Sequence, residues 1–259
     1  LFFKEDTVKL KEFLEKYVKQ GDRGQLMYSI DHGKIRPSKS LADSLAAMLN
    51  KQKEFIMIDE QKVVYELGMS AIRKSSDAKS GKQVIVVRGG PGTGKSVVAI
   101  NLLVEALGEE FNALYVTKNS APRAVYESKL TGVLTRSAYS SLFKGSGGFT
   151  TSGTDSFDAI LVDEAHRLNE KSGLYSNLGE NQIKELINAA KCTVFFLDED
   201  QRIHIKDIGS EEEIKRYALQ AGAEVLCLDL PSQFRCNGSD GYIAWLDNYL
   251  GIRETEIAD

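Results

Sequence analysis

The stretch "VIVVRGGPGTGKSVVAINLLVEALG", residues 84–108, decides the fold. A short β-branched run is followed by the pattern G-x-x-x-x-G-K-[ST] at residues 89–96, and then by a helix-like apolar run. Glycines in such a loop let successive backbone N–H groups turn toward one anion, and the start of the next helix adds its dipole. The sequence therefore predicts a strand, a phosphate-binding loop and a helix, in that order.

Residues of this loop have separate expected roles. Lys95 is expected to neutralise the β- and γ-phosphates of a nucleotide, and Ser96 to offer its hydroxyl to Mg²⁺. The other nucleotide contacts are expected from Gly90, Pro91, Gly92, Thr93, Gly94 and Val97. An accidental glycine turn is the alternative, but the strand and helix patterns on either side argue against it.

A second apolar run, "DAILVDEAH" at residues 158–166, ends in two adjacent carboxylates. Carboxylates at the carboxyl end of a strand in an open α/β sheet face the ligand crevice. Asp163 is expected to bind the water shell of Mg²⁺, and Glu164 to polarise the attacking water. Such a pair is a weak signal alone, but after a phosphate-binding loop it indicates ATP hydrolysis, with ATP and Mg²⁺ as cofactors.

From about residue 55, near-continuous apolar runs alternate with helix-like segments. These runs are "VIVVRG", "ALYVTK", "DAILVDE", "TVFFLDE" and "EVLCLDL". The alternation predicts an α/β fold with a mainly parallel sheet flanked by helices. Residues 1–54 contain an amphipathic helix within a mixed, polar segment, so we predict a small, mostly helical N-terminal appendage (1–54) and one nucleotide-binding lobe (55–259).

A third strand end, "VFFLDEDQRI" at residues 194–203, places a glutamine just after an acidic cluster. The order of apolar strand, aspartate and glutamine resembles motif III of superfamily 1 helicases. In that family the glutamine reads the γ-phosphate and couples it to bound nucleic acid, so the resemblance gives this role to Gln201. A capping side chain in a turn is the alternative.

Three further stretches resemble motifs of the same superfamily. "FIMIDEQKVV" places Gln61 where these helicases keep an adenine-reading glutamine, and "LPSQFRCNGSD" resembles motif IV, whose arginine, here Arg235, approaches the γ-phosphate. "YVTKNSAPR" resembles motif Ia, whose strand end contacts the nucleic-acid backbone. By that resemblance the nucleic-acid contacts are Thr117, Lys118, Pro122 and Arg123.

Taken together, four runs resemble the Schlafen group-3-like DNA/RNA helicase domain family of prokaryotes: "DEAHRLNEKSG", "GENQIKELINAAK", "FFLDEDQRI" and "SQFRCNGSDGYIAWLDNYL". The resemblance covers about residues 55–252. The resemblance implies a RecA-like P-loop NTPase that acts on single-stranded DNA or RNA, with Lys95, Glu164, Gln201 and Arg235 as catalytic residues. Superfamily 1 enzymes close ATP between two RecA-like lobes. We therefore expect the chain to hold the first lobe, with the second lobe elsewhere in the same protein as its partner.

Charge leaves two functions open. The formal net charge is −4 at pH 7, so no overall basic field marks a nucleic-acid-binding protein. The acidic balance mildly favours a regulatory nucleotide switch that acts on a protein partner, whereas Gln61, Gln201 and motif Ia favour a helicase or translocase. Residues 113–148 are locally basic, with Lys118, Arg123, Lys129, Arg136 and Lys144 against Glu127.

Cysteine content and apolar run length predict the cellular compartment of the protein. Cys192, Cys227 and Cys236 form no close pair and have no metal-ligand spacing, which indicates a reducing cytoplasm. The apolar runs fall far short of the roughly 18 residues that a membrane span needs, so no membrane partner is expected. Because the chain begins at Leu1 instead of Met, we expect a piece of a longer protein.

Overall fold

The computed structural model describes residues 7–17, 57–77, 80–130, 135–173, 178–231 and 240–251. The chain divides into two compact units, residues 1–39 and 40–259. In the first unit the described element is helix α1 (Thr7–Tyr17), which lies within the predicted appendage. The predicted boundary after residue 54 lies outside the described residues and stays a prediction.

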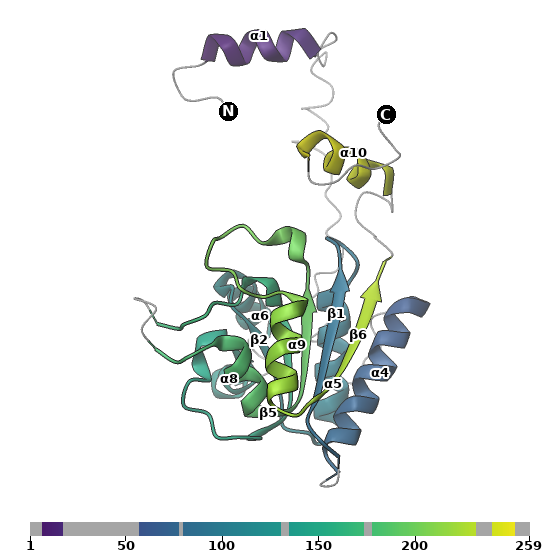
Figure 1. Cartoon of the computed structure of the whole chain (residues 1–259), viewed down its shortest axis with the longest axis vertical. Coiled ribbons are helices and arrows are strands. Elements are labelled where there is room, and N and C mark those ends of the chain that lie inside the picture. The colour runs from purple at the N-terminus through teal and green to yellow at the C-terminus, as the bar shows by residue number, and fades with distance from the viewer. Residues whose placement is uncertain are drawn as a thin grey trace. The chain divides into compact units, whose positions relative to one another are not determined.

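The second unit is built on a six-stranded sheet (Figure 1). Its strands are β1 (Gln83–Gly89), β2 (Ala113–Thr117), β3 (Phe143–Lys144), β4 (Phe157–Asp163), β5 (Ala190–Leu197) and β6 (Glu224–Leu230). The order is β3-β2-β4-β5-β1-β6, and every neighbouring pair is parallel. This confirms the predicted α/β, RecA-like fold with a parallel sheet.

Helices cover both faces of this sheet. The described helices of the second unit are α4 (Asp59–Ser75), α5 (Lys95–Gly108), α6 (Ser120–Leu130), α7 (Arg136–Leu142), α8 (Gln182–Ala189), α9 (Glu211–Gln220) and α10 (Asp240–Leu250). Figure 1 shows α8 and α9 on one face and α5 on the other. Because both faces are covered, strands β1, β2, β4 and β5 are buried along most of their length, whereas the edge strand β6 keeps Glu224, Leu226 and Asp229 exposed.

The side chains of β1 show how one strand serves two cores. Ile85 and Val87 pack into the cluster that includes residues of α4 and α5. Val84 and Val86 point the other way, into the cluster that includes residues of α8 and α9. All four are at most 1% exposed, so the strand is fixed from both sides and holds the loop that follows it.

The strand order brings three predicted motifs to one edge of the sheet. β5 lies between β1 and β4, and it pairs in parallel register with both. The phosphate-binding loop follows β1, Asp163 ends β4, and residues 198–201 follow β5. Because the strands are parallel, these three segments leave the sheet at the same edge, where ligands of open α/β sheets bind. Among the described residues, no helix is long and apolar enough to cross a membrane.

Candidate functional site

The loop between β1 and α5 needs glycine for its shape. Gly92 and Gly94 have φ angles of 81° and 86°, in the left-handed region that side chains disfavour. A Cβ on Gly94 would also lie 2.2 Å from the Gln61 side-chain nitrogen. A Cβ on Gly90, by contrast, would meet no atom within 4 Å, so the loop borders open space there. This geometry suits a loop whose backbone approaches a phosphate closely.

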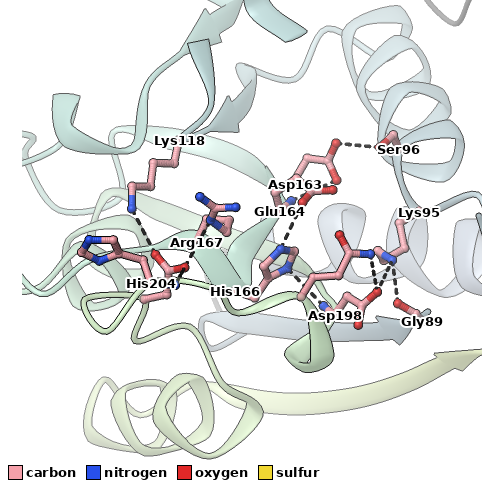
Figure 2. A network of polar contacts seen from close by, with 12 residues as sticks. Gly89, Lys95, Ser96, Lys118, Asp163, Glu164, His166, Arg167, Asp198 and His204 are labelled. Carbon is pink, nitrogen blue, oxygen red and sulfur yellow. Dashed lines mark hydrogen bonds and ion pairs between the residues drawn. The ribbon is translucent and has the colours of Figure 1, made fainter. Parts of the chain in front are cut away.

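Lys95 is folded back onto its own loop. Its Nζ donates to the carbonyls of Gly89 at 2.6 Å and Gly90 at 2.8 Å, and it lies 3.7 Å from Asp198 Oδ2 (Figure 2). Burial lowers the pKa of this ammonium, against the opposing charges of Asp198, Glu164 and Asp163. A phosphate can replace these uncharged carbonyl partners, since it adds the attraction between opposite charges to the hydrogen bond.

The two predicted Mg²⁺ residues meet. Ser96 Oγ donates to Asp163 Oδ2 at 2.7 Å, and Tyr115 donates its hydroxyl to the same oxygen. The backbone N–H of Glu164 donates to Asp163 Oδ1 at 3.0 Å. A hydroxyl and one carboxylate are hard oxygen ligands, and Mg²⁺ usually takes one or two carboxylates together with phosphates and waters. The donor set therefore fits a Mg²⁺ ion that arrives with a nucleotide.

Within the described residues, no larger metal site accompanies this pair. The part of the chain that the structure describes holds no group of three or more His, Cys, Asp or Glu side chains that could bind a metal ion by themselves. Burial raises the pKa of Asp163, although the hydroxyls of Tyr115 and Ser96 oppose that shift by stabilising the carboxylate. A cation at this place would have the same effect as the hydroxyls.

Glu164 adopts an unusual backbone conformation beside a buried histidine. Its φ of 55° is left-handed, which costs a non-glycine residue about 1–3 kcal/mol and is typical of functional sites. His166 Nε2 lies 3.1 Å from Glu164 Oε2, while His166 Nδ1 accepts from the Asp198 N–H at 3.3 Å (Figure 2). The contact with His166 lowers the pKa of Glu164, more than burial raises it. The glutamate is thus held as a carboxylate.

The sequence predicted no role for His166. It is 1% exposed and joins the end of β4 to the end of β5 through the contacts above. The available signal was its place two residues after a predicted catalytic glutamate, at a strand end. That signal was too weak to separate a structural histidine from a functional one.

Gln201 contacts the same aspartate as Lys95. Its Nε2 donates to Asp198 Oδ2 at 2.8 Å, and Lys95 Nζ lies 3.7 Å from that oxygen. Gln201 ends the short turn η4 (Glu199–Gln201), and its backbone N–H donates to the Asp198 carbonyl at 3.1 Å. The structure therefore brings Gln201 and Lys95 together on Asp198, a residue for which the sequence suggested no function of its own.

Gln61 lies beneath the loop and is 6% exposed. Its Nε2 donates to the Thr93 carbonyl at 3.1 Å, and its Oε1 accepts from the Ile58 N–H at 3.3 Å. The amide thus ties the start of α4 to the phosphate-binding loop. Recognition of adenine by Gln61 stays a prediction.

The predicted nucleic-acid contacts are arranged differently. Lys118 Nζ donates to Asn169 Oδ1 at 2.8 Å and to Asp207 Oδ1 at 3.3 Å. Arg167 Nε lies 3.2 Å from the other oxygen of Asp207, whose side chain is fully buried. Thr117 is 1% exposed, and Arg123 Nε donates to the Asn119 carbonyl at 3.4 Å.

The roles of all the predicted site residues stay predictions, and two of these residues lie partly or wholly outside the described residues. The side chain of Pro122 and the whole of Arg235 lie outside the described residues. The roles of Thr117, Lys118 and Arg123 in nucleic-acid binding also stay predictions, because their side chains are buried or bonded within the chain.

The fold and the loop define a P-loop NTPase of the α/β class. The sequence profile of the family described as Schlafen group 3, DNA/RNA helicase domain, matches residues 82–259. The chain belongs to this family. No curated protein matches the chain.

Solved structures similar to the chain include three of the replication initiator DnaA. AMPPCP-bound DnaA from Aquifex aeolicus is 16% identical with a TM-score of 0.39, covering 78% of this chain and 55% of that one. Domain III of DnaA from Thermotoga maritima is 13% identical with a TM-score of 0.37, covering 84% and 76%. DnaA bound to AMPPCP and single-stranded DNA is 16% identical with a TM-score of 0.36, covering 80% and 56%. The chain spans about half the length of the first and third of these proteins.

Proposed function

We propose that this chain is the ATP-binding and ATP-hydrolysing motor lobe of a superfamily 1-type DNA/RNA helicase or translocase. The observation that supports this most is the meeting of Lys95 and Gln201 on Asp198, at the end of the strand between β1 and β4. A glutamine there can respond to the phosphate that Lys95 binds. A strand end with no polar side chain would leave ATP binding without a readout.

ATP binding follows from the loop. Backbone N–H groups of residues 92–96 would surround the β-phosphate, and Lys95 would leave the carbonyls of Gly89 and Gly90 for the phosphate oxygens. Ser96 and Asp163 would hold Mg²⁺, which supplies charge neutralisation to the phosphates. Gln61, whose Nε2 donates to the Thr93 carbonyl, would extend the site toward the base.

Hydrolysis would use Glu164 as general base. A water oxygen attacks the γ-phosphorus, the bond from that phosphorus to the β,γ-bridging oxygen breaks, and the water proton passes to Glu164. ADP and phosphate are the products. The contact with His166 keeps Glu164 ionised and hence able to accept this proton.

Coupling to nucleic acid would pass through the segment after Gln201. Gly209 in that segment packs so closely that a Cβ would lie 1.9 Å from the Ala165 carbonyl oxygen, and Ile208 N–H donates to the Leu168 carbonyl at 2.8 Å. Asp207 contacts Lys118 at the end of β2. A shift of Gln201 on loss of the γ-phosphate would therefore reach the predicted motif Ia surface through packed contacts.

The partners of this lobe follow from the same proposal. Single-stranded DNA or RNA would lie across the end of β2, and a second RecA-like lobe would cover the phosphates and add an arginine beside Arg235. Arginines supplied to the γ-phosphate contribute about 10³ to 10⁵ in rate. We therefore expect this chain alone to bind ATP but to hydrolyse it slowly. We expect the protein to act in the cytoplasm.

The test is the steady-state ATPase rate of the longest natural protein that carries this lobe, with and without single-stranded DNA or RNA. A motor lobe predicts clear stimulation by one polymer, and the Lys95→Ala variant should show no stimulated rate. ATP turnover that neither polymer changes would contradict the motor and favour the alternative, a regulatory nucleotide switch acting on a protein partner.

A further inference from the structure

Tyr115 holds an unassigned position in this site. It lies on β2 within the stretch that resembles motif Ia, but it precedes the predicted nucleic-acid contacts and points into the protein, where it is 0% exposed. Its hydroxyl donates to Oδ2 of Asp163, on the neighbouring strand β4. Burial raises the pKa of Tyr115 well above its ordinary value, so the hydroxyl keeps its proton and acts as the donor.

The donors around Asp163 fix the orientation of its carboxylate. Oδ2 accepts from Ser96 and from Tyr115, and Oδ1 accepts from the N–H of Glu164. Glu164 directly follows Asp163 at the end of β4, and Ser96 lies in α5. Tyr115, by contrast, reaches Asp163 from the neighbouring strand β2. Rotation of the carboxylate about its Cβ–Cγ bond would break at least one of these bonds in a buried place, where unmade hydrogen bonds are costly.

The ring of Tyr115 is itself fixed. Its centroid lies 5.8 Å from that of Tyr126 in an edge-on arrangement with an interplanar angle of 77°. It lies 5.5 Å from the ring of Phe143, tilted by 49°. Aromatic packing of this kind leaves a side chain with two χ angles little freedom. The hydroxyl is therefore held at a defined point beside Asp163.

We propose that Tyr115 is a positioning residue that orients Asp163 for the Mg²⁺ of bound ATP. This rests on the proposed function, because it assigns a role within the same nucleotide site. Ligating carboxylates are commonly held by hydrogen bonds from surrounding residues, and loss of such a partner typically costs 10- to 100-fold in metal affinity or activity. The alternative is that the hydrogen bond from Tyr115 to Asp163 only satisfies a buried hydroxyl and has no role in Mg²⁺ binding.

The test is the affinity of the chain for a fluorescent ATP analogue, measured in EDTA and across a Mg²⁺ titration. Tyr115→Phe keeps the ring and removes the hydroxyl. We expect its affinity in EDTA to stay within about twofold of wild type, whereas the Mg²⁺ concentration for half-maximal enhancement rises about 10-fold or more. An unchanged Mg²⁺ dependence, or an equal loss with and without Mg²⁺, would overturn the proposal.

Tyr139→Phe is the matched control. Tyr139 belongs to the same aromatic cluster, stacked at 4.8 Å on Phe143, but its hydroxyl donates to the Arg123 carbonyl. Its removal should leave the Mg²⁺ titration unchanged. In an Asp163→Asn background, Tyr115→Phe should add no further change, and an added change would show that the tyrosine does not act through Asp163.

A second measurement needs no variant and covers the case in which Tyr115→Phe does not fold. In the wild-type chain, the buried Tyr115 hydroxyl proton can be followed by NMR after tyrosine labelling. It should shift when Mg²⁺ is added to the nucleotide complex, and an unmoved resonance would overturn the proposal. If the wild type failed to bind the analogue with Mg²⁺ present, the proposed function would fail together with this inference.

Discussion

Two regions at the same edge of the sheet differ in how their side chains are used. In the phosphate region, formed by Lys95, Ser96, Asp163, Asp198 and Gln201, side chains from three strand ends converge on one another. In the β2-exit region, formed by Thr117, Lys118, Arg123 and Asp207, they are buried or paired inside the chain.

The two regions differ in which existing contacts a ligand phosphate would have to replace. In the phosphate region, Lys95 donates to two neutral carbonyls, and the Asp198 carboxylate lies 3.7 Å from its Nζ, too far for a hydrogen bond. In the β2-exit region, Lys118 faces the buried carboxylate of Asp207, so a nucleic-acid phosphate would have to compete with an existing charge. We infer that the phosphate region is ready for its ligand and that the β2-exit region depends on internal pairs for its shape.

The largest expected effect on nucleotide binding is at the phosphate region. Lys95→Ala removes a charge-assisted contact to the phosphates, which we expect to weaken binding of Mg-ATP by about 10- to 100-fold or more, since such contacts contribute roughly 1.5–3 kcal/mol. Calorimetric titration measures this. Lys74→Ala, which breaks an exposed ion pair with Glu224 at the start of β6, is the control and should bind like wild type. Equal affinity of the two variants would remove the distinction between the regions.

The second prediction concerns a variant that should lose ATP turnover but keep its affinity for the nucleotide. Glu164→Gln keeps the shape of the side chain but removes the base, so kcat should fall about 10²- to 10⁴-fold while nucleotide affinity holds. Steady-state ATPase assays of the longest natural protein that carries this lobe measure kcat, with Glu66→Gln on the exposed face of α4 as the control. Turnover close to wild type would mean that another group accepts the proton.

The third prediction tests whether the ion pairs of the β2-exit region stabilise the fold. Asp207→Asn leaves Lys118 and Arg167 without their carboxylate, and we expect the free energy of unfolding to fall by about 1–3 kcal/mol. Urea unfolding measures this. Asp59→Asn, at an almost fully exposed carboxylate, should change stability by less than about 0.5 kcal/mol. If Asp207→Asn left stability unchanged, the pairs around it would not be holding the region.

The smallest effect is a pH dependence of stability from the same aspartate. Burial alone would raise the pKa of Asp207, but hydrogen bonds from His204 and Lys118 and the charges of Lys118 and Arg167 lower it overall. A lowered pKa in the folded state gives stability that is present above the ordinary value of 3.8 and is lost as the pH falls below it. Asp207→Asn should therefore flatten the acid side of the stability curve, measured by urea unfolding between about pH 5 and pH 2.5. A curve parallel to that of wild type would contradict this reading.

The strand, loop and helix that carry the phosphate region could be predicted from the sequence for a physical reason. A backbone cradle needs glycines at fixed spacing between a strand and a helix, and residues 89–96 show that spacing directly. Asp163 was predictable because it ends an apolar strand, and Gln201 because a family resemblance singled it out. Parallel pairing of β5 with both β1 and β4 then brings these residues together.

The contacts of Tyr115, Lys118 and His166 could not be predicted, because they join segments far apart in the sequence. Nothing in "YVTK" shows that Tyr115 reaches Asp163 or that Lys118 meets Asp207, because both partners belong to other segments. His166 was overlooked for the same reason, since its Nδ1 bonds the backbone at the end of β5. A single sequence without the fold does not contain these pairings.

The measurement that tests the central claim most directly is a structure of this chain with Mg²⁺ and a non-hydrolysable ATP analogue. We expect the phosphates on the N–H groups of residues 92–96, the cation beside Ser96 and Asp163, and Lys95 Nζ moved from the Gly89 and Gly90 carbonyls onto the phosphates. An analogue bound away from this edge of the sheet, or Lys95 still on those carbonyls with the nucleotide in place, would contradict the account.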